Sequence, residues 1–421
     1  MKPVVTGVGV VCSIASNVPA FEAALREGRC GIVQTPDLGD GGPRLAAPVT
    51  GFSFEDAVAA LTTLPDELRH NALRTAHRSP DPLRIDLVAA MQAFESAGLH
   101  CAPVPADRIG LVVAGHNLNS GYVHDLRPAY DDNPARLPAR FALHAMDTDR
   151  VGTLSQVLGV RGEGYTVGGA SASGNVGIVN ASHLLAADAA DACLVVGPTT
   201  EMSPMEKHGL ATLGAVAGAG EDEPDREMCR PFDADHDGFV PGQGAACLVL
   251  ESERSAKSRG ATVLAELAGY DLKLDANSLP DPNEDGEATV MASAMARAGV
   301  EPGEVDYVNA HATSTPQGDD VEVRALHRAL GPEVGRPWVN STKGLVGHCM
   351  CAAGVVEAVA TVLQMRGGFV HPNLNLRRPI DDGCRFVGQV AEPADIACAL
   401  SNSFGFGGFN SCIVLKRRSL G

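Results

Sequence analysis

The chain has 421 residues and a net charge of −18 at pH 7, because 51 acidic residues outnumber 33 basic ones. This charge argues against a nucleic-acid-binding surface, which needs basic residues to neutralise phosphates. No apolar run reaches the roughly 18 residues of a membrane span, and the N-terminus lacks a basic and then apolar export signal. The 11 cysteines are scattered and odd in number, which favours reduced thiols. We therefore expect a cytoplasmic protein that binds neither nucleic acid nor membrane.

Strand patterns alternate with helical patterns along the whole chain. The first half holds, in chain order, a predicted strand at 4–11, helices at 19–28 and 86–97, and strands at 109–114, 192–197, 244–251 and 262–268. The second half holds a predicted helix at 287–298, a strand at 305–309, a helix at 319–330, a strand at 338–341, a helix at 351–365 and strands at 397–402 and 411–415. Segments 34–52, 116–138 and 215–229 are rich in Gly, Pro and Asp and are predicted to be surface loops. This alternation indicates an α/β fold with parallel sheet and helical layers.

Residues 165–174 are predicted to form a short strand, a turn of small residues and the start of a helix that ends near residue 187. The turn places Ser171 at a helix N-terminus, where unpaired amides and the helix dipole favour negative charge and can stabilise an oxyanion. A thiol there would have a lowered pKa and act as a nucleophile, whereas a hydroxyl is far less acidic and needs a dedicated base. We therefore expect chemistry on a carbonyl group without a thioester intermediate on Ser171.

Four ordered motifs lie between residues 230 and 410. They are RPFDADHDGFVPGQG at 230–244, VNAHATSTP at 308–316, STKGLVGH at 341–348 and NSFGFGGFN at 402–410. Over nearly the whole chain, the sequence resembles the β-ketoacyl-ACP synthases of the thiolase-like superfamily. The resemblance implies a five-layered αβαβα fold with two pseudo-symmetric halves. These would be residues 1–255, which carry Ser171, and residues 256–421, which carry His311, Lys343 and His348.

Two histidines, His311 and His348, stand inside these motifs. A lone histidine is more often a core or surface residue, but the resemblance implies that both converge beside Ser171 and offer imidazole N–H groups to a thioester oxygen. Neutral imidazole suits this role, because one nitrogen donates while the other accepts an orienting hydrogen bond. Two such donors in a water-poor site stabilise an enolate. The resemblance also implies that Lys343 and Glu357 form a buried pair that orients the catalytic groups.

Four further residues in the motifs are candidates for substrate contacts. Thr313 and Thr315 alternate on an extended segment, so both hydroxyls should face one side. The resemblance implies that they bind a phosphopantetheine amide, and turn-capping hydroxyls are the alternative. Phe404, in a Gly-rich loop, would gate the reacting carbonyl and supply a backbone N–H to the oxyanion hole, with Phe406 as a substrate-binding neighbour. Phe409 stands where the family usually has Thr.

Two patterns imitate metal sites, but we predict no bound metal. Asp233, Asp235 and Asp237 lack the ligand spacing and the closing Glu of a calcium hand, so a structural turn is expected. Cys349 and Cys351 flank His348 but have no second Cys/His pair, so they are predicted to be small buried residues.

Arginines gather in one stretch, at Arg69, Arg74, Arg78 and Arg84. A solvated surface is the simple interpretation. The alternative is that Arg69, Arg74 and Arg78 dock an acidic carrier protein, because a chain of this net charge needs a local basic patch for that purpose.

The residues for decarboxylation are present, while Ser171 replaces the thiol that loads an acyl group. Such a chain resembles the malonyl-ACP decarboxylases of polyketide β-branching cassettes. The resemblance implies conversion of malonyl-ACP or methylmalonyl-ACP to acetyl-ACP or propionyl-ACP, with the acyl group on the carrier protein's 4′-phosphopantetheine and no cofactor bound by the enzyme. It also implies a homodimer and a partner like hydroxymethylglutaryl (HMG) synthase. The preference between malonyl and methylmalonyl stays open.

Three alternatives stay open beside this interpretation. Ser171 could be acylated with His311 as the base, as in an acyltransferase or an unusual condensing enzyme. The chain could be a non-catalytic partner like a chain-length factor, although those usually lose the histidines. The serine could be an engineered replacement, although Gly168 and Gly169 before it differ from the family pattern and favour a native lineage.

Overall fold

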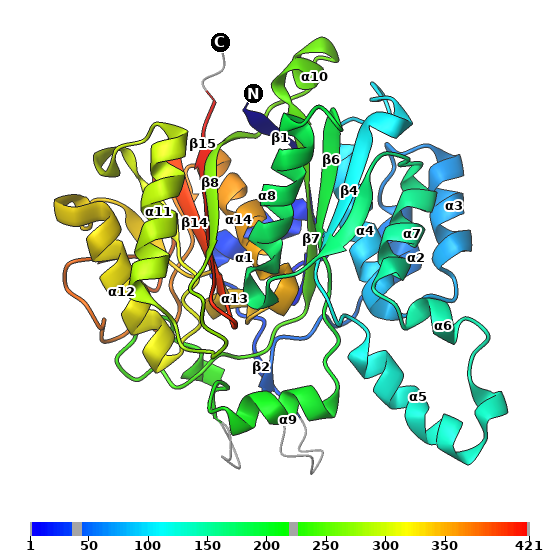
Figure 1. Ribbon diagram of the computed structural model, residues 1–421, viewed down its shortest axis with the longest axis horizontal. Helices are drawn as coiled ribbons and strands as arrows, with labels where there is room; N and C mark the ends of the chain where they lie inside the picture. The colour runs from blue at the N-terminus through cyan, green and yellow to red at the C-terminus, as the bar shows by residue number, and fades with distance from the viewer. Residues whose placement is uncertain (1, 36–43, 219–225, 419–421) are drawn as a thin grey trace.

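A computed structural model describes residues 2–35, 44–218 and 226–418 of the chain (Figure 1). Eleven strands form one mixed sheet in the order β12-β10-β9-β14-β15-β8-β1-β7-β6-β4-β5. At its centre β1 (Pro3–Cys12) meets β8 (Ala265–Leu274) over two residue pairs only, Val4 with Glu266 and Val5 with Ala265. The sheet therefore consists of two half-sheets that touch at one corner.

The two half-sheets have the same topology. The N-terminal half-sheet runs from β1 through β7 (Gly244–Ser252), β6 (Ala192–Gly197) and β4 (Ile109–Ala114) to β5 (Gly164–Val167). The C-terminal half-sheet runs from β8 through β15 (Phe409–Lys416), β14 (Cys398–Gly405), β9 (Tyr307–Asn309) and β10 (Trp338–Asn340) to the edge strand β12 (Arg385–Phe386). In each, the first two pairings are antiparallel and the next two are parallel. The predicted pseudo-symmetry is present, while the boundary between residues 255 and 256 stays a prediction.

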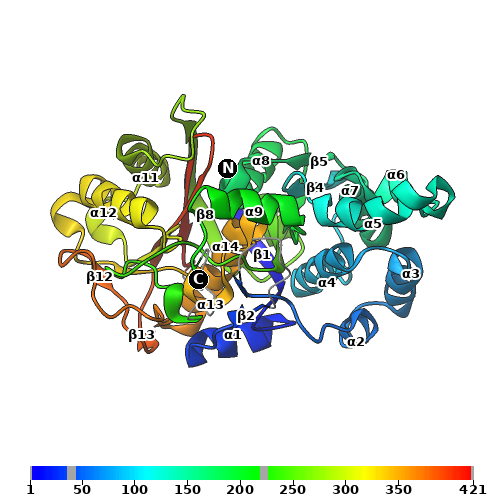
Figure 2. The ribbon, with the colours of Figure 1, turned by 90° about the horizontal axis from the view of Figure 1, so that it is seen from below.

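Helices lie between the half-sheets and on both outer faces (Figures 1 and 2). The middle layer is α8 (Ser173–Ala186) and α14 (Ala353–Gly367), which contact each other and strands of both halves. On the outer faces, α4 (Asp81–Ser96) and α7 (Thr148–Leu158) pack on the N-terminal half-sheet, and α11 (Glu284–Ala298), joined by α12 (Pro316–Leu330), packs on the C-terminal one. The order is helix, sheet, helix, sheet, helix, so the predicted αβαβα arrangement is confirmed.

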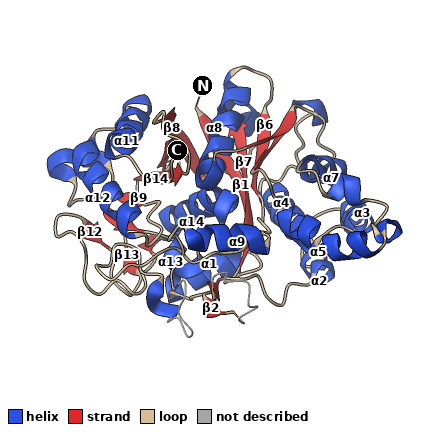
Figure 3. Cartoon of the chain, turned by 60° about the horizontal axis from the view of Figure 1, so that its bottom comes forward, coloured by secondary structure: helices blue, strands red, loops and turns tan. Residues whose placement is uncertain are grey.

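The remaining elements are short or lie at the periphery (Figure 3). They are α1 (Val18–Glu27), β2 (Val33–Gln34), β3 (Leu45–Ala46), α2 (Phe54–Ala59), α3 (Asp66–Ala76), α5 (Ser120–Asp132), α6 (Phe141–His144), α9 (Pro204–Thr212), α10 (Glu253–Ser258), α13 (Lys343–Val346), β11 (Phe369–Val370) and β13 (Glu392–Pro393). In the described ranges, every helix is too short or too polar to cross a bilayer.

The N-termini of the two middle helices meet at a pair of glycines. A Cβ added to Gly174 would lie 2.6 Å from the backbone N of Val355, and one added to Gly354 would lie 2.9 Å from the backbone N of Asn175. Any larger residue would force the two helices apart, since real Cβ contacts are longer than this. The glycines therefore bring the turns before α8 and α14 together at the centre of the molecule.

Some predicted boundaries were wrong, each for a local reason. Helix α4 begins at Asp81 and not at residue 86, because Pro82 sits in the first turn, where its missing N–H is harmless. Predicted loop 116–138 contains α5, which continues through Pro128. Strand β8 begins later and ends later than predicted, because it pairs with β15 as far as Leu274. Residues 36–43 and 219–225 of the other two predicted loops lie outside the described residues.

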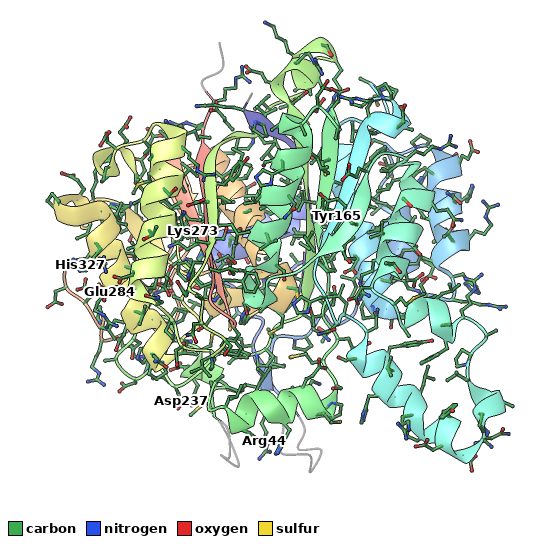
Figure 4. The ribbon with its side chains drawn as sticks, viewed as in Figure 1. Arg44, Tyr165, Asp237, Lys273, Glu284 and His327 are labelled. Atoms are coloured by element: carbon green, nitrogen blue, oxygen red, sulfur yellow. The ribbon has the colours of Figure 1, made fainter. Side chains whose placement is uncertain are left out.

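Ion pairs join the outer C-terminal helices. Glu284 of α11 contacts Arg324 and Arg328 of α12. His327, also on α12, hydrogen-bonds Asp381 over 3.0 Å. Figure 4 shows Glu284 and His327 on this outer surface. These charges stabilise the periphery and are remote from the middle layer.

Candidate active site

A tight turn between β5 and α8 carries Ser171. It opens with Ala170, whose φ of +48° lies in the left-handed region that non-glycine residues seldom adopt. Ser173 holds this turn from within: its Oγ accepts the Gly169 N–H at 2.9 Å and donates to the Ala170 carbonyl at 2.7 Å. The Ala172 N–H also donates to the Gly169 carbonyl. These bonds fix Ser171 at the N-terminus of α8, as the sequence predicted.

His348 lies beside this serine, with its Nε2 2.8 Å from the Ser171 Oγ. Its other ring nitrogen, Nδ1, accepts a hydrogen bond from the Met350 backbone N–H at 3.2 Å. Burial, and next the charge of Lys343, lower the pKa of His348 well below its ordinary 6.5. The ring is therefore neutral, and since Nδ1 accepts, the proton is on Nε2. Nε2 donates to Ser171, so it is not the base that a serine nucleophile needs.

His311 has the same tautomer for a different reason. The Lys343 ammonium lies 3.4 Å from its Nδ1, and because an ammonium only donates, Nδ1 accepts and the proton is on Nε2. Burial, followed by Lys343 and His348, lowers the pKa of His311 well below 6.5. The two histidine rings meet edge to face, with centroids 5.7 Å apart. The structure thus brings together two neutral imidazoles, each with a proton on Nε2.

Lys343 and Glu357 form a buried ion pair behind the histidines. Both residues are 1% exposed. Burial raises the pKa of Glu357 to about 7, against the opposing charge of Lys343. Lys343 belongs to α13 and Glu357 to α14, so the pair ties the segment that carries His348 to the middle layer. His348 itself lies in the segment between these two helices.

Three residues that pack around the histidines escaped the sequence analysis. Glu322 of α12 accepts the backbone N–H groups of His311 and Ala312, at 2.9 and 2.7 Å, and a side-chain hydrogen bond from Asn402. The ring of Phe239 meets the His348 ring edge to face at 5.2 Å. Phe239 and Asn402 stand inside motifs, so they could have been found, whereas Glu322 has no comparable signal. Glu322 therefore holds the backbone at His311, and Phe239 packs against the His348 ring.

The hydroxyls of Thr313 and Thr315 lie together, 2.9 Å apart. The predicted same-side placement is present, but through a turn and not a strand. Between them Ser314 is buried with a φ of +68°, and its N–H donates to Asp319. Thr315 is the N-cap residue of α12, yet its side chain makes no capping hydrogen bond. The turn-capping alternative therefore fails for Thr315.

The phenylalanines of the last motif lie in three different environments. Phe404 is part of strand β14, opposite Asn410, and not of a loop as predicted. It is 7% exposed, and its ring lies 5.6 Å from the His311 ring, between centroids. Phe406, by contrast, is 42% exposed. Phe404 is therefore the phenylalanine that borders the site.

Gly168 and Gly169, just before Ser171, have large neighbours. A Cβ on Gly168 would lie 2.1 Å from Cδ2 of His116, and a Cβ on Gly169 would lie 3.1 Å from Cδ1 of Phe409. His116 therefore fits against Gly168, and Phe409 fits against Gly169.

The arginine stretch lies on the outer N-terminal layer. Arg69 pairs with Asp66, and Arg74 and Arg78 are exposed. Arg84 instead donates to the backbone carbonyls of Ala76 and His77, which joins the end of α3 to α4. Arg84 has a structural role, and the carrier-docking role of Arg69, Arg74 and Arg78 stays a prediction.

The aspartates and cysteines that imitate metal sites have other partners. The Asp233 carboxylate accepts the backbone N–H groups of Asp235, Arg377 and Arg378 at 2.6 to 2.9 Å, which makes a structural turn. Cys349 and Cys351 are buried free thiols, and burial raises the pKa of Cys349.

Comparisons with known proteins cover the whole chain. The family model described as "Beta-ketoacyl synthase, N-terminal domain" matches residues 1–256, and "Beta-ketoacyl synthase, C-terminal domain" matches residues 264–377. The chain is 36% identical to the polyketide biosynthesis malonyl-ACP decarboxylase PksF of Bacillus subtilis, over 98% of this chain and 96% of the relative. It is 33% identical to the 3-oxoacyl-[acyl-carrier-protein] synthase 2 of Coxiella burnetii, over 99% and 98%.

Solved structures of high similarity have the same architecture. The crystal structure of a β-ketoacyl synthase from Burkholderia phymatum matches with a TM-score of 0.85 and 30% identity, over 99% of both chains. A type II polyketide ketosynthase in complex with its acyl carrier protein, AntDE:AntF, matches with a TM-score of 0.84 and 26% identity, over 99% of both chains. The fold is therefore the thiolase-like fold of ketosynthases.

Proposed function

This chain belongs to the β-ketoacyl synthase family, and we propose that it acts there as a decarboxylase that converts malonyl-ACP, or methylmalonyl-ACP, to the corresponding acetyl or propionyl carrier protein. The proposal depends on the position of one proton, on His348 Nε2. Since the Met350 N–H occupies Nδ1, Nε2 donates to the Ser171 Oγ and cannot remove its proton. Both histidines are thus set to donate to an anionic oxygen, and Ser171 lacks the base that a serine nucleophile requires.

The decarboxylation would proceed at the thioester. The bond between the α-carbon and the carboxylate breaks, carbon dioxide leaves, and the electron pair becomes an enolate of the remaining acyl thioester. The N–H groups of His311 and His348 stabilise its oxygen. A water molecule then gives a proton to the α-carbon, and the hydroxide that remains is neutralised by the solvent. Phe404 presents an apolar ring beside His311, which disfavours the charged carboxylate relative to neutral carbon dioxide.

Substrate delivery fits the same geometry. The hydroxyls of Thr313 and Thr315 bond each other, and that of Thr315 does not cap α12, so their remaining hydrogen-bonding capacity can serve the amide of a phosphopantetheine arm. The relative from B. subtilis is named a malonyl-ACP decarboxylase, and the AntDE:AntF ketosynthase was solved with its carrier protein. We extend both to this chain: an acyl carrier protein is its substrate-bearing partner, with Arg69, Arg74 and Arg78 as the docking residues.

The pathway and the assembly are further proposals. PksF is named a polyketide biosynthesis protein. We infer that this chain serves β-branching and supplies acetyl-ACP to an HMG-synthase-like partner. We also infer that it is a homodimer. Light scattering gives the molecular mass in solution, and a monomer would contradict the assembly. Replacement of the three arginines by Ser should raise the KM for malonyl-ACP, and an unchanged KM would contradict the docking role.

The decisive experiment is incubation with malonyl-ACP, followed by intact-protein mass spectrometry of both proteins. The expected result is a carrier lighter by one carbon dioxide and an enzyme of unchanged mass. Relatives named 3-oxoacyl-ACP synthase favour a second candidate, a condensing enzyme that loads Ser171. Incubation with acetyl-ACP separates the two: an enzyme heavier by one acetyl group, lost in Ser171→Ala, would support loading and contradict the decarboxylase.

A further inference from the structure

His116 lies against the serine turn from a segment far away in the sequence. It follows strand β4, in the loop before α5. Its ring packs so closely on Gly168 that a Cβ there would lie 2.1 Å from Cδ2. The contact is therefore possible only because residue 168 is glycine.

The same ring accepts a hydrogen bond from the turn. Its Nε2 lies 3.3 Å from the backbone N of Ala170, whose N–H can only donate. Ala170 is the left-handed residue directly before Ser171. Residues in that region persist where the surrounding structure holds them. His116 thus bonds the one strained residue of the turn.

The loop that carries His116 is itself anchored. The carboxylate of Asp147 accepts the backbone N–H groups of Asn117 and Leu118, at 2.8 and 2.9 Å. In the described residues, the other side chain from outside the turn that bonds its backbone is Ser403, whose Oγ donates to the Ser171 carbonyl at 3.3 Å. A fixed loop on one side and a strand on the other therefore clamp the turn.

We propose that His116 is a positioning residue: by accepting the Ala170 N–H it holds the serine turn in the backbone conformation that keeps Ser171 against His348. This inference rests on the proposed function for its kinetic consequence. Its structural content, the bond to Ala170, is independent of which reaction the site performs. No part of His116 contacts the reacting atoms in this scheme.

Three variants test it. His116→Leu keeps an apolar side chain of moderate size but removes the acceptor, whereas His116→Gln places an amide oxygen near the position of Nε2. His124→Leu is the matched control, since His124 is an exposed histidine of the adjoining helix α5. All three are purified as full-length chains and compared with wild type.

The first readout is hydrogen–deuterium exchange of the Ala170 amide. In His116→Leu this amide should exchange at least about tenfold faster than in wild type, because its bond is lost. His116→Gln should restore most of the protection, and His124→Leu should not alter it. Equal exchange in wild type and His116→Leu would overturn the proposal, whether or not the protein decarboxylates malonyl-ACP.

The second readout is the rate of carbon dioxide release from malonyl-ACP. His116→Leu should lower kcat about tenfold with little change in KM, since one hydrogen bond that positions the chemical step is lost. His116→Gln should recover kcat to within about threefold. A kcat of His116→Gln as low as that of His116→Leu would overturn the positioning role. Absence of release in wild type would instead refute the proposed function and leave the exchange result to decide the bond.

Discussion

The two halves of this protein contain the same turn in two different environments. Ala170 before Ser171 and Met350 before Cys351 both have left-handed backbones, with φ of +48° and +51°. Each opens a short 3-10 turn that leads into a middle helix, α8 or α14. The two turns contact each other where these helices meet. Local backbone geometry therefore does not distinguish the serine from the cysteine.

The side chains around the two turns distinguish Ser171 from Cys351. Cys351 is 6% exposed and packs in the apolar cluster that includes Leu118, while Ser171 receives a hydrogen bond from His348. The C-terminal half also has a longer segment between its strand and its turn, and this segment carries Lys343 and His348. A helix N-terminus therefore becomes a reaction site only where polar groups point toward it.

Loss of the buried charge in that longer segment should have the largest effect. Lys343→Met leaves Glu357 buried without a partner, so we expect the free energy of unfolding to fall by about 3–5 kcal/mol. The variant raises the pKa of Glu357 further above its ordinary 4.5, so the folded state holds a proton that the unfolded state releases, and stability falls as pH rises. Urea unfolding at pH 6 and pH 8 measures the loss in free energy of unfolding and its dependence on pH.

Two controls sharpen this test. Lys257→Met removes an exposed lysine of α10 and should leave the free energy of unfolding unchanged. Lys343→Met combined with Glu357→Leu should recover part of the loss. An effect of Lys343→Met no greater than that of Lys257→Met would contradict a buried ion pair.

Removal of either imidazole should come next. We expect His348→Ala and His311→Ala each to lower kcat for carbon dioxide release by about 10²- to 10³-fold, because each removes one donor to the enolate oxygen. Steady-state release from malonyl-ACP measures it, with His124→Ala as the control. Retained release in both site variants would refute the mechanism.

A thiol in each turn would compare the two environments directly. In Ser171→Cys, the new thiol lies beside His348 and the N-terminus of α8, so iodoacetamide should modify it on the order of 10²-fold faster than it modifies the buried Cys351. Peptide mapping by mass spectrometry identifies the modified residue. Equal rates would mean that local geometry, and not the neighbours, sets reactivity.

The smallest effect concerns pH. Burial lowers the pKa of His311 and His348 well below 6.5, so both rings stay neutral as the pH falls through the ordinary histidine range. In a Glu357→Gln variant, which removes the neighbouring carboxyl whose pKa is about 7, we expect kcat to change by less than about twofold between pH 8 and pH 6. A loss of rate with a midpoint near pH 6.5 would contradict the two neutral donors.

The sequence predicted the layers of the fold and several of the side chains that the fold brings together. The spacing of apolar residues predicted most helices and strands, because the buried face of a helix or a strand recurs with the period of that element. The motifs indicated Ser171, the two histidines, Lys343 and Glu357, and the structure brings all five together. Prediction from the sequence failed where tertiary contacts override local signals. Phe404 extends strand β14 because it pairs with Asn410, and α5 forms in a segment rich in turn residues.

The amino-acid sequence by itself determined that a serine replaces the thiol and that two histidines remain, since residue types are written in the chain. Only the tertiary structure decided which nitrogen of each imidazole carries the proton, because that depends on Met350 and Lys343 reaching the opposite side of each ring. The tertiary structure also explains why residues 168 and 169 are glycines, since His116 and Phe409 occupy the space that their side chains would need. The contacts of Lys343 with His311, of His116 with Gly168 and of Phe409 with Gly169 join segments that meet only when the chain folds, so no local pattern contains them.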